Sequence, residues 1–340
     1  MKILVTGAGS LIGHGVLRSL RQIPRKDFTV VTADPDHRAA GHWLGDHGVT
    51  IPLARDNNYI DSLKEIISQH KIDVVFVGTD PELLKISNAL DQLKTTVVIS
   101  KPNVIEIGDD KWKTVQFLKA NGFSYPDSAL ADDPKEVRAL VERVGFPLIA
   151  KPRIGARSAG VSQVKSEKDL AAVPTTGYVL QELLPEGPGE FTAGTMTYNG
   201  KCYSQVIFRR DLKDGNTYRA YTYSNASHQE FLKTLSEKMP GVYGPLNFQY
   251  RLKNDKPTVF EINSRFSGTT PLRTAIGINE VEMAVDFVRN GTVTTPKQTL
   301  NNVAILRTWS DIIVPIDQLD MFADAKELDS PSATYFPFMK

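Results

Sequence analysis

Short apolar runs alternate with helical patterns over the first hundred residues of the chain. Four runs are typical of buried strands: residues 3–6, 29–33, 73–77 and 96–99. The segments between them carry apolar residues at three- and four-residue spacing, as amphipathic helices do: residues 11–22, 59–69 and 82–93. This alternation predicts a parallel sheet with crossover helices, so that residues 1–105 form a Rossmann-like α/β domain.

The rest of the chain predicts an α+β module made of two parts. The first part, residues 106–185, has two capped helices (111–120 and 134–144) and two strands (147–151 and 178–183) that enclose a loop with two glycines. From about residue 190 the pattern is mostly that of strands, followed by one helix and a late strand. These elements are residues 191–198, 201–209, 218–224, 246–252, 258–263, 278–288 and 303–309. We therefore expect a sheet domain over residues 186–340.

The charge balance and the composition exclude several classes of protein. The 340 residues carry 40 Lys and Arg against 39 Asp and Glu, so the chain is not broadly basic like many nucleic-acid-binding proteins. No run approaches the roughly 18 apolar residues of a membrane span, and the apolar run after Lys2 is too short for a secretory signal. The single cysteine, Cys202, excludes an intramolecular disulfide and a cysteine-based zinc site. We expect a cytoplasmic protein without nucleic-acid or membrane partners.

A predicted hairpin in the C-terminal third places four polar side chains on one face. Apolar and polar residues alternate in both strands, and side chains alternate between the two faces of a strand. The polar set is Gln249, Glu261, Asn263 and Arg265. Oxygen atoms of Gln, Glu and Asn suit Mg²⁺, whose other ligands are phosphate oxygens and water, and an arginine contacts the same phosphates. Taken alone, this face is equally typical of a hydrated sheet surface.

Two earlier segments are candidates for nucleotide binding. Lys151 ends an apolar strand and precedes the glycine loop 155–160, where backbone N–H groups and an ammonium group suit phosphate oxygens. This loop is not the GxxxxGK[ST] phosphate loop, and a flexible surface turn is the alternative. Residues 181–185 form a strand that ends at proline, with Glu190 beyond it. Such a strand offers backbone groups to an adenine ring, and the carboxylate offers oxygens to ribose hydroxyls.

In this order, these segments resemble the ATP-grasp superfamily, in particular its carbamoyl-phosphate-synthase-like and carboxylate–amine ligase branch. The similarity covers roughly residues 105–290, with a family-like α/β domain before it. The combination is far more specific than any single segment. The residues that carry it are Asp110-Lys111, Lys151-Pro152 with the loop to Val161, Gln181-Glu182-Leu183-Leu184, Glu190, Asn247-Phe248-Gln249 and Glu261-Ile262-Asn263-Ser264-Arg265.

The resemblance implies a role for each of these positions, with ATP held between residues 106–185, which act as a lid, and the sheet domain. The implied nucleotide contacts are Lys111, Lys151, Arg157, Ser158 and Gly160 for the phosphates, Gln181, Glu182 and Leu184 for adenine, and Glu190 for ribose. The implied ligands of Mg²⁺ (or Mn²⁺) are Gln249, Glu261 and Asn263. Lys151 and Arg265 are implied to be catalytic because they hold the phosphoryl group that is transferred.

Two positions depart from the pattern of the family. Gln249 stands where many relatives have an acid, so one metal ion is held with less charge. Arg157 lies in a loop where small residues are commoner. These departures leave the number of bound Mg²⁺ ions open.

The reaction implied by the resemblance is ATP-dependent amide formation. A substrate carboxylate attacks the γ-phosphate to give an acyl phosphate and ADP, and an amine then displaces phosphate. The sequence leaves the acid and the amine open, since amino acids, sugar acids and peptides are all compatible, and it leaves a homodimer open as well.

Candidate substrate contacts lie in two further segments. Arg209 or Arg210, in a charged turn, suits an anionic acyl phosphate, and a hydrated hairpin is the alternative. Ser267 and Thr269, shortly after the proposed metal ligands, suit substrate hydroxyl or carboxylate groups, and a helix cap is the alternative. Asp80, which follows a predicted strand, is expected to cap a helix rather than to contact substrate.

The glycines near the N-terminus raise a rival function. Residues 7–13 have the spacing GxGxxxG after a predicted strand, and Asp34 ends the next strand, which resembles NAD(P)-dependent short-chain reductases and sugar epimerases. Those enzymes use a Tyr-x-x-x-Lys pair, and none of the 11 tyrosines has a lysine four residues on. We therefore interpret the loop as structural or substrate-binding. A regulatory protein that binds MgATP without turnover is a second alternative.

Overall fold

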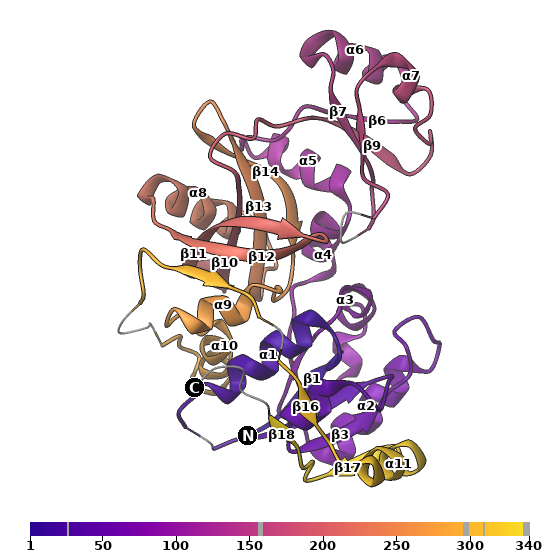
Figure 1. The fold of residues 1–340 in the computed structure, drawn as a ribbon, viewed down its shortest axis with the longest axis vertical. Coiled ribbons are helices and arrows are strands. Elements are labelled where there is room, and N and C mark those ends of the chain that lie inside the picture. Colours follow the sequence, from indigo (N-terminus) through magenta and orange to yellow (C-terminus); the bar gives the residue numbers. More distant parts are fainter. Residues whose placement is uncertain (26, 156–158, 295–298, 309, 336–340) are drawn as a thin grey trace.

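The N-terminal sheet consists of buried strands joined by helices (Figure 1). The computed structural model describes residues 1–25, 27–155, 159–294, 299–308 and 310–335. The sheet has the strand order β17-β3-β2-β1-β4-β5. Its parallel strands are β1 (Lys2–Thr6), β2 (Thr29–Asp34), β3 (His47–Thr50), β4 (Val74–Phe76) and β5 (Thr96–Val98). Its helical segments are α1 (Leu11–Arg21), η1 (Ala40–Leu44), α2 (Tyr59–His70), α3 (Asp80–Ser87), η2 (Leu90–Gln92) and α4 (Pro102–Asp109).

The side chains of β1 explain why helices cover both faces of this sheet. Ile3 and Val5 lie in one hydrophobic cluster together with residues of α1, whereas Leu4 lies in another together with residues of α2. All three side chains are fully buried. A parallel strand that is buried on both faces has a continuous apolar run, which is the pattern that predicts this domain. The predicted Rossmann-like α/β fold is confirmed.

The edge strand of this sheet comes from the far end of the chain. β17 (Glu327–Asp329) pairs antiparallel with β3, and α11 (Ile316–Ala325) precedes it, so that yellow and violet segments meet in Figure 1. A separate pair of strands joins β16 (Ile312–Ile313) to β18 (Thr334–Tyr335). The sequence pattern assigns all these residues to the sheet domain, whereas the structure places β17 in the N-terminal sheet. The division at residues 105 and 185 stays a prediction.

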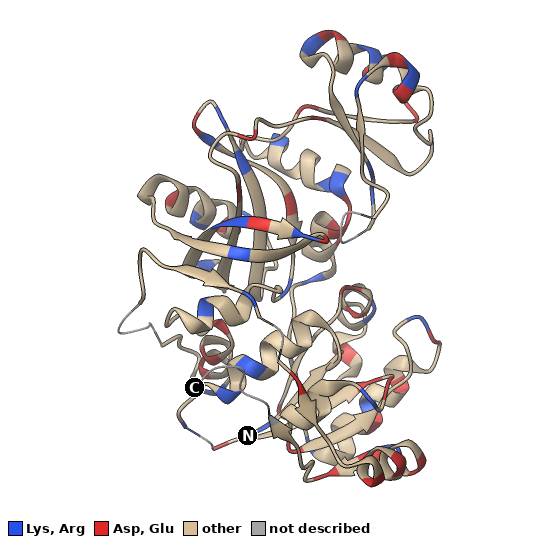
Figure 2. Cartoon of the chain, in the orientation of Figure 1, with Lys and Arg blue, Asp and Glu red and all other residues tan. Residues whose placement is uncertain are grey.

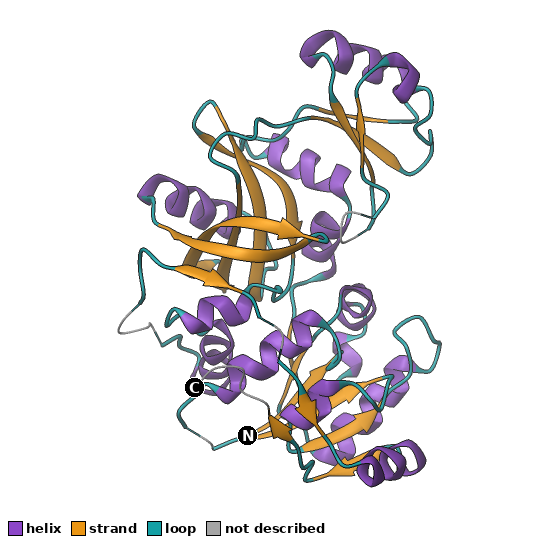
Figure 3. Cartoon of the chain, in the orientation of Figure 1, coloured by secondary structure: helices purple, strands orange, loops and turns teal. Residues whose placement is uncertain are grey.

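A small antiparallel sheet with its own helices projects at one end of the molecule (Figure 3). The strands, in the order β6-β9-β7-β8, are β6 (Ser128–Leu130), β7 (Leu148–Pro152), β8 (Ser162–Val164) and β9 (Tyr178–Glu182). The helices of this region are α5 (Lys111–Ala120), α6 (Pro134–Val144) and α7 (Glu167–Leu170). The predicted bounds of α5 and α6 are confirmed. Both helices begin where expected because the carboxylates of Asp110 and Asp133 accept hydrogen bonds from backbone N–H groups of the first turn.

The large sheet is entirely antiparallel and has the order β14-β13-β10-β11-β12-β15. Its strands are β10 (Glu190–Tyr198), β11 (Lys201–Lys213), β12 (Asn216–Tyr223), β13 (Gly244–Lys253), β14 (Lys256–Asn263) and β15 (Ala304–Leu306). The sequence pattern predicts mostly strands from residue 190 on and misses one helix there, α8 (Ala226–Glu237). This helix packs Leu232 and Leu235 into the core that contains Phe248 of the sheet. Its apolar stripe is short, and the polar residues around it hide the helical period.

Two helices, α9 (Thr270–Ala275) and α10 (Glu280–Asn290), join the large sheet to the N-terminal domain (Figure 1). One hydrophobic cluster contains Val16 of α1, Val281 of α10 and Tyr198 of β10. The ring of Tyr198 stacks on that of Phe287, with 3.8 Å between the ring centroids. The two domains therefore share one core, which fixes the position of one relative to the other.

Charged side chains are mixed along the chain. Figure 2 shows Lys and Arg interspersed with Asp and Glu rather than gathered over one part of the molecule. Within the described residues, we find no helix with the length and apolar character that crossing a membrane requires.

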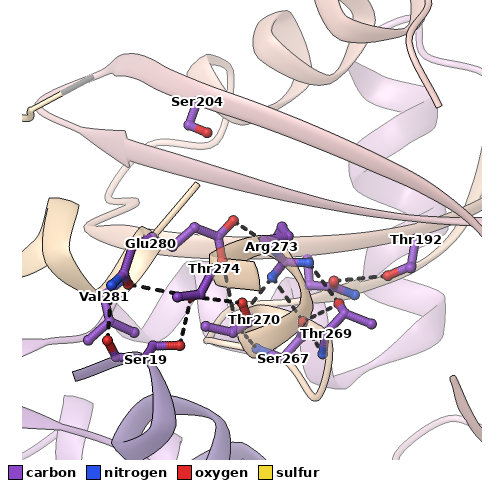
Figure 4. Close-up of polar contacts among 12 residues, drawn as sticks. Ser19, Thr192, Ser204, Ser267, Thr269, Thr270, Arg273, Thr274, Glu280 and Val281 are labelled. Carbon is purple, nitrogen blue, oxygen red and sulfur yellow. Dashed lines mark hydrogen bonds and ion pairs between the residues drawn. The ribbon is translucent and has the colours of Figure 1, made fainter. Parts of the chain in front are cut away.

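A buried ion pair holds the loop before α9 in place. Arg273 and Glu280 are each 1% exposed, and Nε of the guanidinium lies 2.8 Å from Oε1 of the carboxylate. Figure 4 shows Arg273 between Glu280 on one side and Ser267 and Thr269 on the other. Its Nη1 donates to Thr269 Oγ1 at 2.7 Å, and its Nη2 donates to Ser267 Oγ at 3.0 Å. Gly194 of β10 leaves room for this pair, since a Cβ there would lie 2.4 Å from Arg273 Cζ.

We expect Arg273→Met to lower the free energy of unfolding by about 3–5 kcal/mol, because it leaves a buried carboxylate without its partner. Lys233→Met is the matched control. It breaks an exposed ion pair with Glu230 and should cost about 1 kcal/mol or less. Urea unfolding followed by circular dichroism measures both. Adding Glu280→Leu to the first variant should recover much of the loss, and equal losses for the two single variants would contradict this account.

Candidate active site

One cavity of about 920 Å³ lies where the small sheet, the large sheet and the N-terminal domain meet. The strands β7, β9, β10, β11, β13 and β14 contribute to its walls, as do the turns after β1, β2 and β4. Most of the residues that the sequence singles out line it together. They are Lys111, Lys151, Gln181, Glu182, Leu184, Glu190, Arg210, Gln249, Glu261, Asn263, Arg265, Ser267 and Thr269.

Four predicted residues are not among those that line the cavity. Arg157 and Ser158 lie outside the described residues. Gly160 does not line the cavity, although Gly155, Ala159 and Val161 of the same loop do. Arg209 points away from it and places its guanidinium over the ring of Tyr221, 4.1 Å from the centroid. Because neighbouring residues of a strand face opposite sides, only Arg210 of the two arginines reaches the cavity.

Two buried lysines form one wall. Lys111, the first residue of α5, is 8% exposed, and its Nζ donates to the Gly155 carbonyl oxygen at 2.9 Å. Lys151, in β7, is 7% exposed, and its Nζ donates to the Phe260 carbonyl oxygen at 3.3 Å. Burial lowers the pKa of Lys111 and lowers that of Lys151 to about 8, although Glu261 opposes both shifts. Each ammonium group has three donors and, among the described residues, donates one hydrogen bond, so both suit the oxygens of a phosphate chain.

The polar face of the β13–β14 hairpin also lines the cavity, next to Lys151. The strand register places Gln249 directly beside Glu261, and Asn263 follows on the same face. Glu261 Oε1 accepts hydrogen bonds from Gln249 Nε2 and Asn263 Nδ2, each at 3.0 Å. Within the described residues, Glu261 Oε2 has no hydrogen-bond partner, so it is free to meet a ligand.

The side chains of this face suit a metal ion that takes few ligands from the protein. In the described part of the chain, no group of three or more His, Cys, Asp or Glu side chains is arranged to hold a metal ion by itself. Glu261 Oε2 is the open oxygen of this face, because Gln249 Oε1 accepts from Arg210 Nη2 at 2.7 Å and Asn263 Oδ1 accepts from Arg265 Nη2 at 2.9 Å. One open carboxylate oxygen matches a cation that takes most of its ligands from phosphates and water, as Mg²⁺ does. Glu261 would hold such an ion, and Asn263 and Gln249 would join it once their oxygens are released by the two arginines.

Arg210 connects the polar face of the β13–β14 hairpin to Glu190. The register of β10 and β11 pairs these two residues, and Glu190 Oε1 accepts from Arg210 Nε at 3.0 Å and Nη2 at 2.5 Å. Arg210 Nη2 also donates to Gln249 Oε1 at 2.7 Å. Glu190 Oε2 accepts from Arg251 Nη2 at 3.4 Å. Glu190 is therefore held by two arginines, and its role toward ribose stays a prediction.

The predicted adenine hinge lies where β9 ends. The carboxylate of Glu182 accepts from the Asp127 backbone N–H at 2.9 Å and from Lys253 Nζ at 2.7 Å. Because this side chain is occupied by the protein, it is not left to contact a base. Gln181 is 3% exposed, and among the described residues its buried Nε2 has no hydrogen-bond partner, so it has a free donor at the cavity wall.

An ion pair links the segment after β14 to the N-terminal domain. Arg265 Nε donates to Asp80 Oδ1 at 2.6 Å, and its Nη2 donates to Asp80 Oδ2 at 3.2 Å. The expectation that Asp80 caps a helix is wrong. Thr79 is the N-cap of α3 and forms a capping box with Glu82, which leaves Asp80 free to orient the arginine.

The sequence analysis missed two residues of this region. Arg273 donates hydrogen bonds to Ser267 and Thr269 and so fixes their positions. Arg307, just after β15, lines the cavity. Neither residue belongs to a local motif, so only the three-dimensional fold identifies them.

The N-terminal glycines serve close packing, which supports our interpretation of that loop. Gly7 has φ +56°, and a Cβ there would lie 2.4 Å from Thr79 Cγ2; a Cβ at Gly13 would lie 2.1 Å from the Gly7 carbonyl oxygen. Asp34 Oδ2 accepts from the Gly9 N–H at 2.8 Å. One oxygen of the residue that would hold the ribose of a dinucleotide is thus taken by the loop itself.

Family models match almost the whole chain in three parts. Residues 3–99 match the PylC-like N-terminal domain, residues 108–186 match the RimK-like ATP-grasp domain, and residues 176–308 match ATP-grasp in the biosynthetic pathway with Ter operon. The carbamoyl phosphate synthase large chain of Pseudothermotoga lettingae is 23% identical over 84% of this chain. The alignment covers only 28% of that relative's length.

Solved structures share the fold at low sequence identity. N5-carboxyaminoimidazole ribonucleotide synthetase from Thermus thermophilus superposes with a TM-score of 0.72 at 15% identity, over 94% of this chain and 86% of that one. L-amino acid ligase from Bacillus licheniformis gives a TM-score of 0.65 at 19% identity, over 85% and 74%. Two ATP-grasp models cover residues 108–308 without a gap, and these residues contribute most of the walls of the cavity, which the N-terminal domain completes. The chain belongs to the ATP-grasp superfamily, and over most of its length it is similar to carbamoyl phosphate synthase large chains.

Proposed function

We propose that the protein is an ATP- and Mg²⁺-dependent ligase that joins a carboxylate to an amine and releases ADP and phosphate. The observation that carries this proposal is that two buried lysines line the same cavity as Glu261 and Arg265. Among proteins of the same fold, one structure is of a synthetase in complex with ADP and another is of an L-amino acid ligase. The matched relatives are much longer than this chain, so the acid and the amine are not carried over from them.

In the proposed reaction, a carboxylate oxygen attacks the γ-phosphorus, and the bond to the β-phosphate oxygen breaks to release ADP. The amine nitrogen then attacks the acyl carbon, phosphate leaves, and the amine loses a proton. Lys111 and Lys151 hold the phosphates, and Arg265, oriented by Asp80, neutralises charge on the transferred group. Mg²⁺, when bound, supplies further charge neutralisation. The small sheet acts as a lid that excludes water from the acyl phosphate.

Ligand-dependent thermal stability separates this function from its rivals. At 100 times the dissociation constant, MgATP should stabilise the protein by about 2.7 kcal/mol, ATP with chelator should do so less, and NADPH should have no effect. Stabilisation by NADPH alone would overturn the proposal in favour of a reductase or epimerase. If MgATP binds but no acid and amine pair releases ADP, the protein is a regulatory ATP-binding protein instead.

We expect Glu261→Gln to lower the rate of ADP formation at least about 100-fold, because the variant removes the carboxylate that would hold Mg²⁺ and keeps the shape of the side chain. Glu230→Gln, on the exposed face of α8, is the matched control and should keep the wild-type rate. A coupled assay for ADP measures the rate, and circular dichroism checks the fold. Wild-type ADP formation by Glu261→Gln would show that the metal assignment is wrong.

The low pKa of Lys151 predicts that nucleotide binding weakens in alkali. The group is protonated below about pH 8 and loses its charge above it, so ATP affinity should fall by up to about tenfold between pH 7 and pH 9. Burial also lowers the pKa of Lys111, which acts in the same direction. In Lys151→Arg, most of this dependence should disappear because a guanidinium stays charged. Calorimetric titrations at several pH values measure it, with the exposed Lys233→Arg as control; a flat wild-type profile contradicts the prediction.

A further inference from the structure

We propose that the N-terminal side of the cavity binds the acid substrate, and that this acid is a small apolar carboxylate whose charged group contacts Arg307. This inference names the substrate class of the reaction proposed above and rests on that function. It starts from two features of the cavity that the nucleotide does not need: a wall of exposed leucines and an arginine without an acidic partner.

The apolar wall comes from three separate elements of the N-terminal domain. Leu11 opens α1, Leu53 follows β3, and Leu84 lies in α3. Their exposed fractions are 40%, 43% and 36%, and all three line the cavity. They are also the large hydrophobic side chains that are exposed in the described part of residues 1–100. Single exposed leucines are ordinary on protein surfaces, but three that converge on one concavity indicate an apolar ligand.

The prolines of the neighbouring turns extend this wall. Pro35, Pro52 and Pro81 line the cavity beside the leucines and have no side-chain hydrogen-bonding group. The polar chains nearby are already engaged. Asp80 is paired with Arg265, and Asp34 accepts from two backbone N–H groups. A sugar acid, which needs partners for several hydroxyl groups, therefore fits this side poorly.

Arg307 stands at the end of the apolar wall, next to Leu11. Its Nη2 donates to the Gly268 carbonyl oxygen, and a Cβ at Gly268 would lie 2.7 Å from Leu11 Cδ2, so these residues pack side by side. Arg307 Nε is buried, and the described residues offer it no hydrogen-bond partner. Burial, and secondarily the charge of Arg18, lowers the pKa of the Arg307 guanidinium.

The other arginines of the cavity differ from Arg307. Arg210 and Arg251 are paired with Glu190, and Arg265 is paired with Asp80. Among the described residues, Arg307 is the cavity arginine that has no carboxylate within ion-pair distance. A partly desolvated cation without a counter-charge costs free energy, and a ligand carboxylate restores the pairing with charge-assisted hydrogen bonds. A ligand whose carboxylate lies beside Gly268 and whose apolar chain lies along the leucines would meet both features, and a small apolar carboxylate is such a ligand.

Calorimetric titration of the full chain, with and without a saturating non-hydrolysable Mg²⁺–ATP analogue, tests this inference. The probes are 4-methylpentanoate, its neutral amide, acetate and gluconate. The inference expects 4-methylpentanoate to bind at least about tenfold more tightly than each of the others. Arg307→Met should remove most of its preference over the amide, Arg307→Lys should keep part of it, and Leu53→Ser should reduce its preference over acetate.

Arg219→Met is the matched control, because Arg219 lies opposite Leu306 on the neighbouring strand and outside the cavity. It should bind all probes as the wild type does. Binding of the analogue by Arg307→Met shows that this variant is folded. If the four probes bind the wild type equally, or if Arg307→Met binds 4-methylpentanoate as tightly as the wild type, the inference is wrong. Failure of the analogue to bind would instead contradict the proposed function, since the acid titrations are made without it as well.

Discussion

The active-site geometry depends on the hydrophobic core that the N-terminal domain shares with the large sheet. Tyr198 of β10 stacks on Phe287 of α10 in the same cluster as Val16 of α1. The large apolar area buried there sets the two sheets at a fixed distance, and only then can a short contact such as that between Arg265 and Asp80 form between them. The cavity is therefore a consequence of domain packing, and its two halves are built by segments that are far apart in sequence.

Within this frame, the cations of the cavity fall into two groups. Arg210, Arg265 and Arg273 are each held in a defined orientation by a carboxylate of the protein. Lys111, Lys151 and Arg307 are at least partly desolvated, and the described residues pair none of them with an acid. Keeping such groups charged costs free energy in the unliganded protein, and anionic ligands offset that cost. All three of these cations line the same cavity, so anions bound there would restore the pairing that the protein itself does not supply.

Local patterns in the sequence predict the parts of this site that lie within one or two adjacent elements. The alternation in β13 and β14 places Glu261 and Asn263 on one face, and the capping aspartates fix where α5 and α6 begin. Long-range contacts could not be predicted from local patterns. Asp80 and Arg265, for example, are 185 residues apart, and no sequence motif contains both. The helix α8 was missed for a different reason, since its buried stripe is interrupted by polar residues within a strand-rich region.

The turn after β1 shows how one fold can serve a different ligand. In a dinucleotide-binding domain, this turn leaves the first N–H groups of the helix free for a pyrophosphate. Here Ser10 Oγ accepts from the Gly13 N–H at 2.8 Å, and Asp34 takes the Gly9 N–H, so the chain itself satisfies two of these donors. The first residue of α1 that faces the cavity is then Leu11, an apolar side chain. The same glycines that make the turn tight enough for a nucleotide here bring Leu11 close to Gly268 and Arg307, which converts a phosphate-binding turn into one wall of an apolar site.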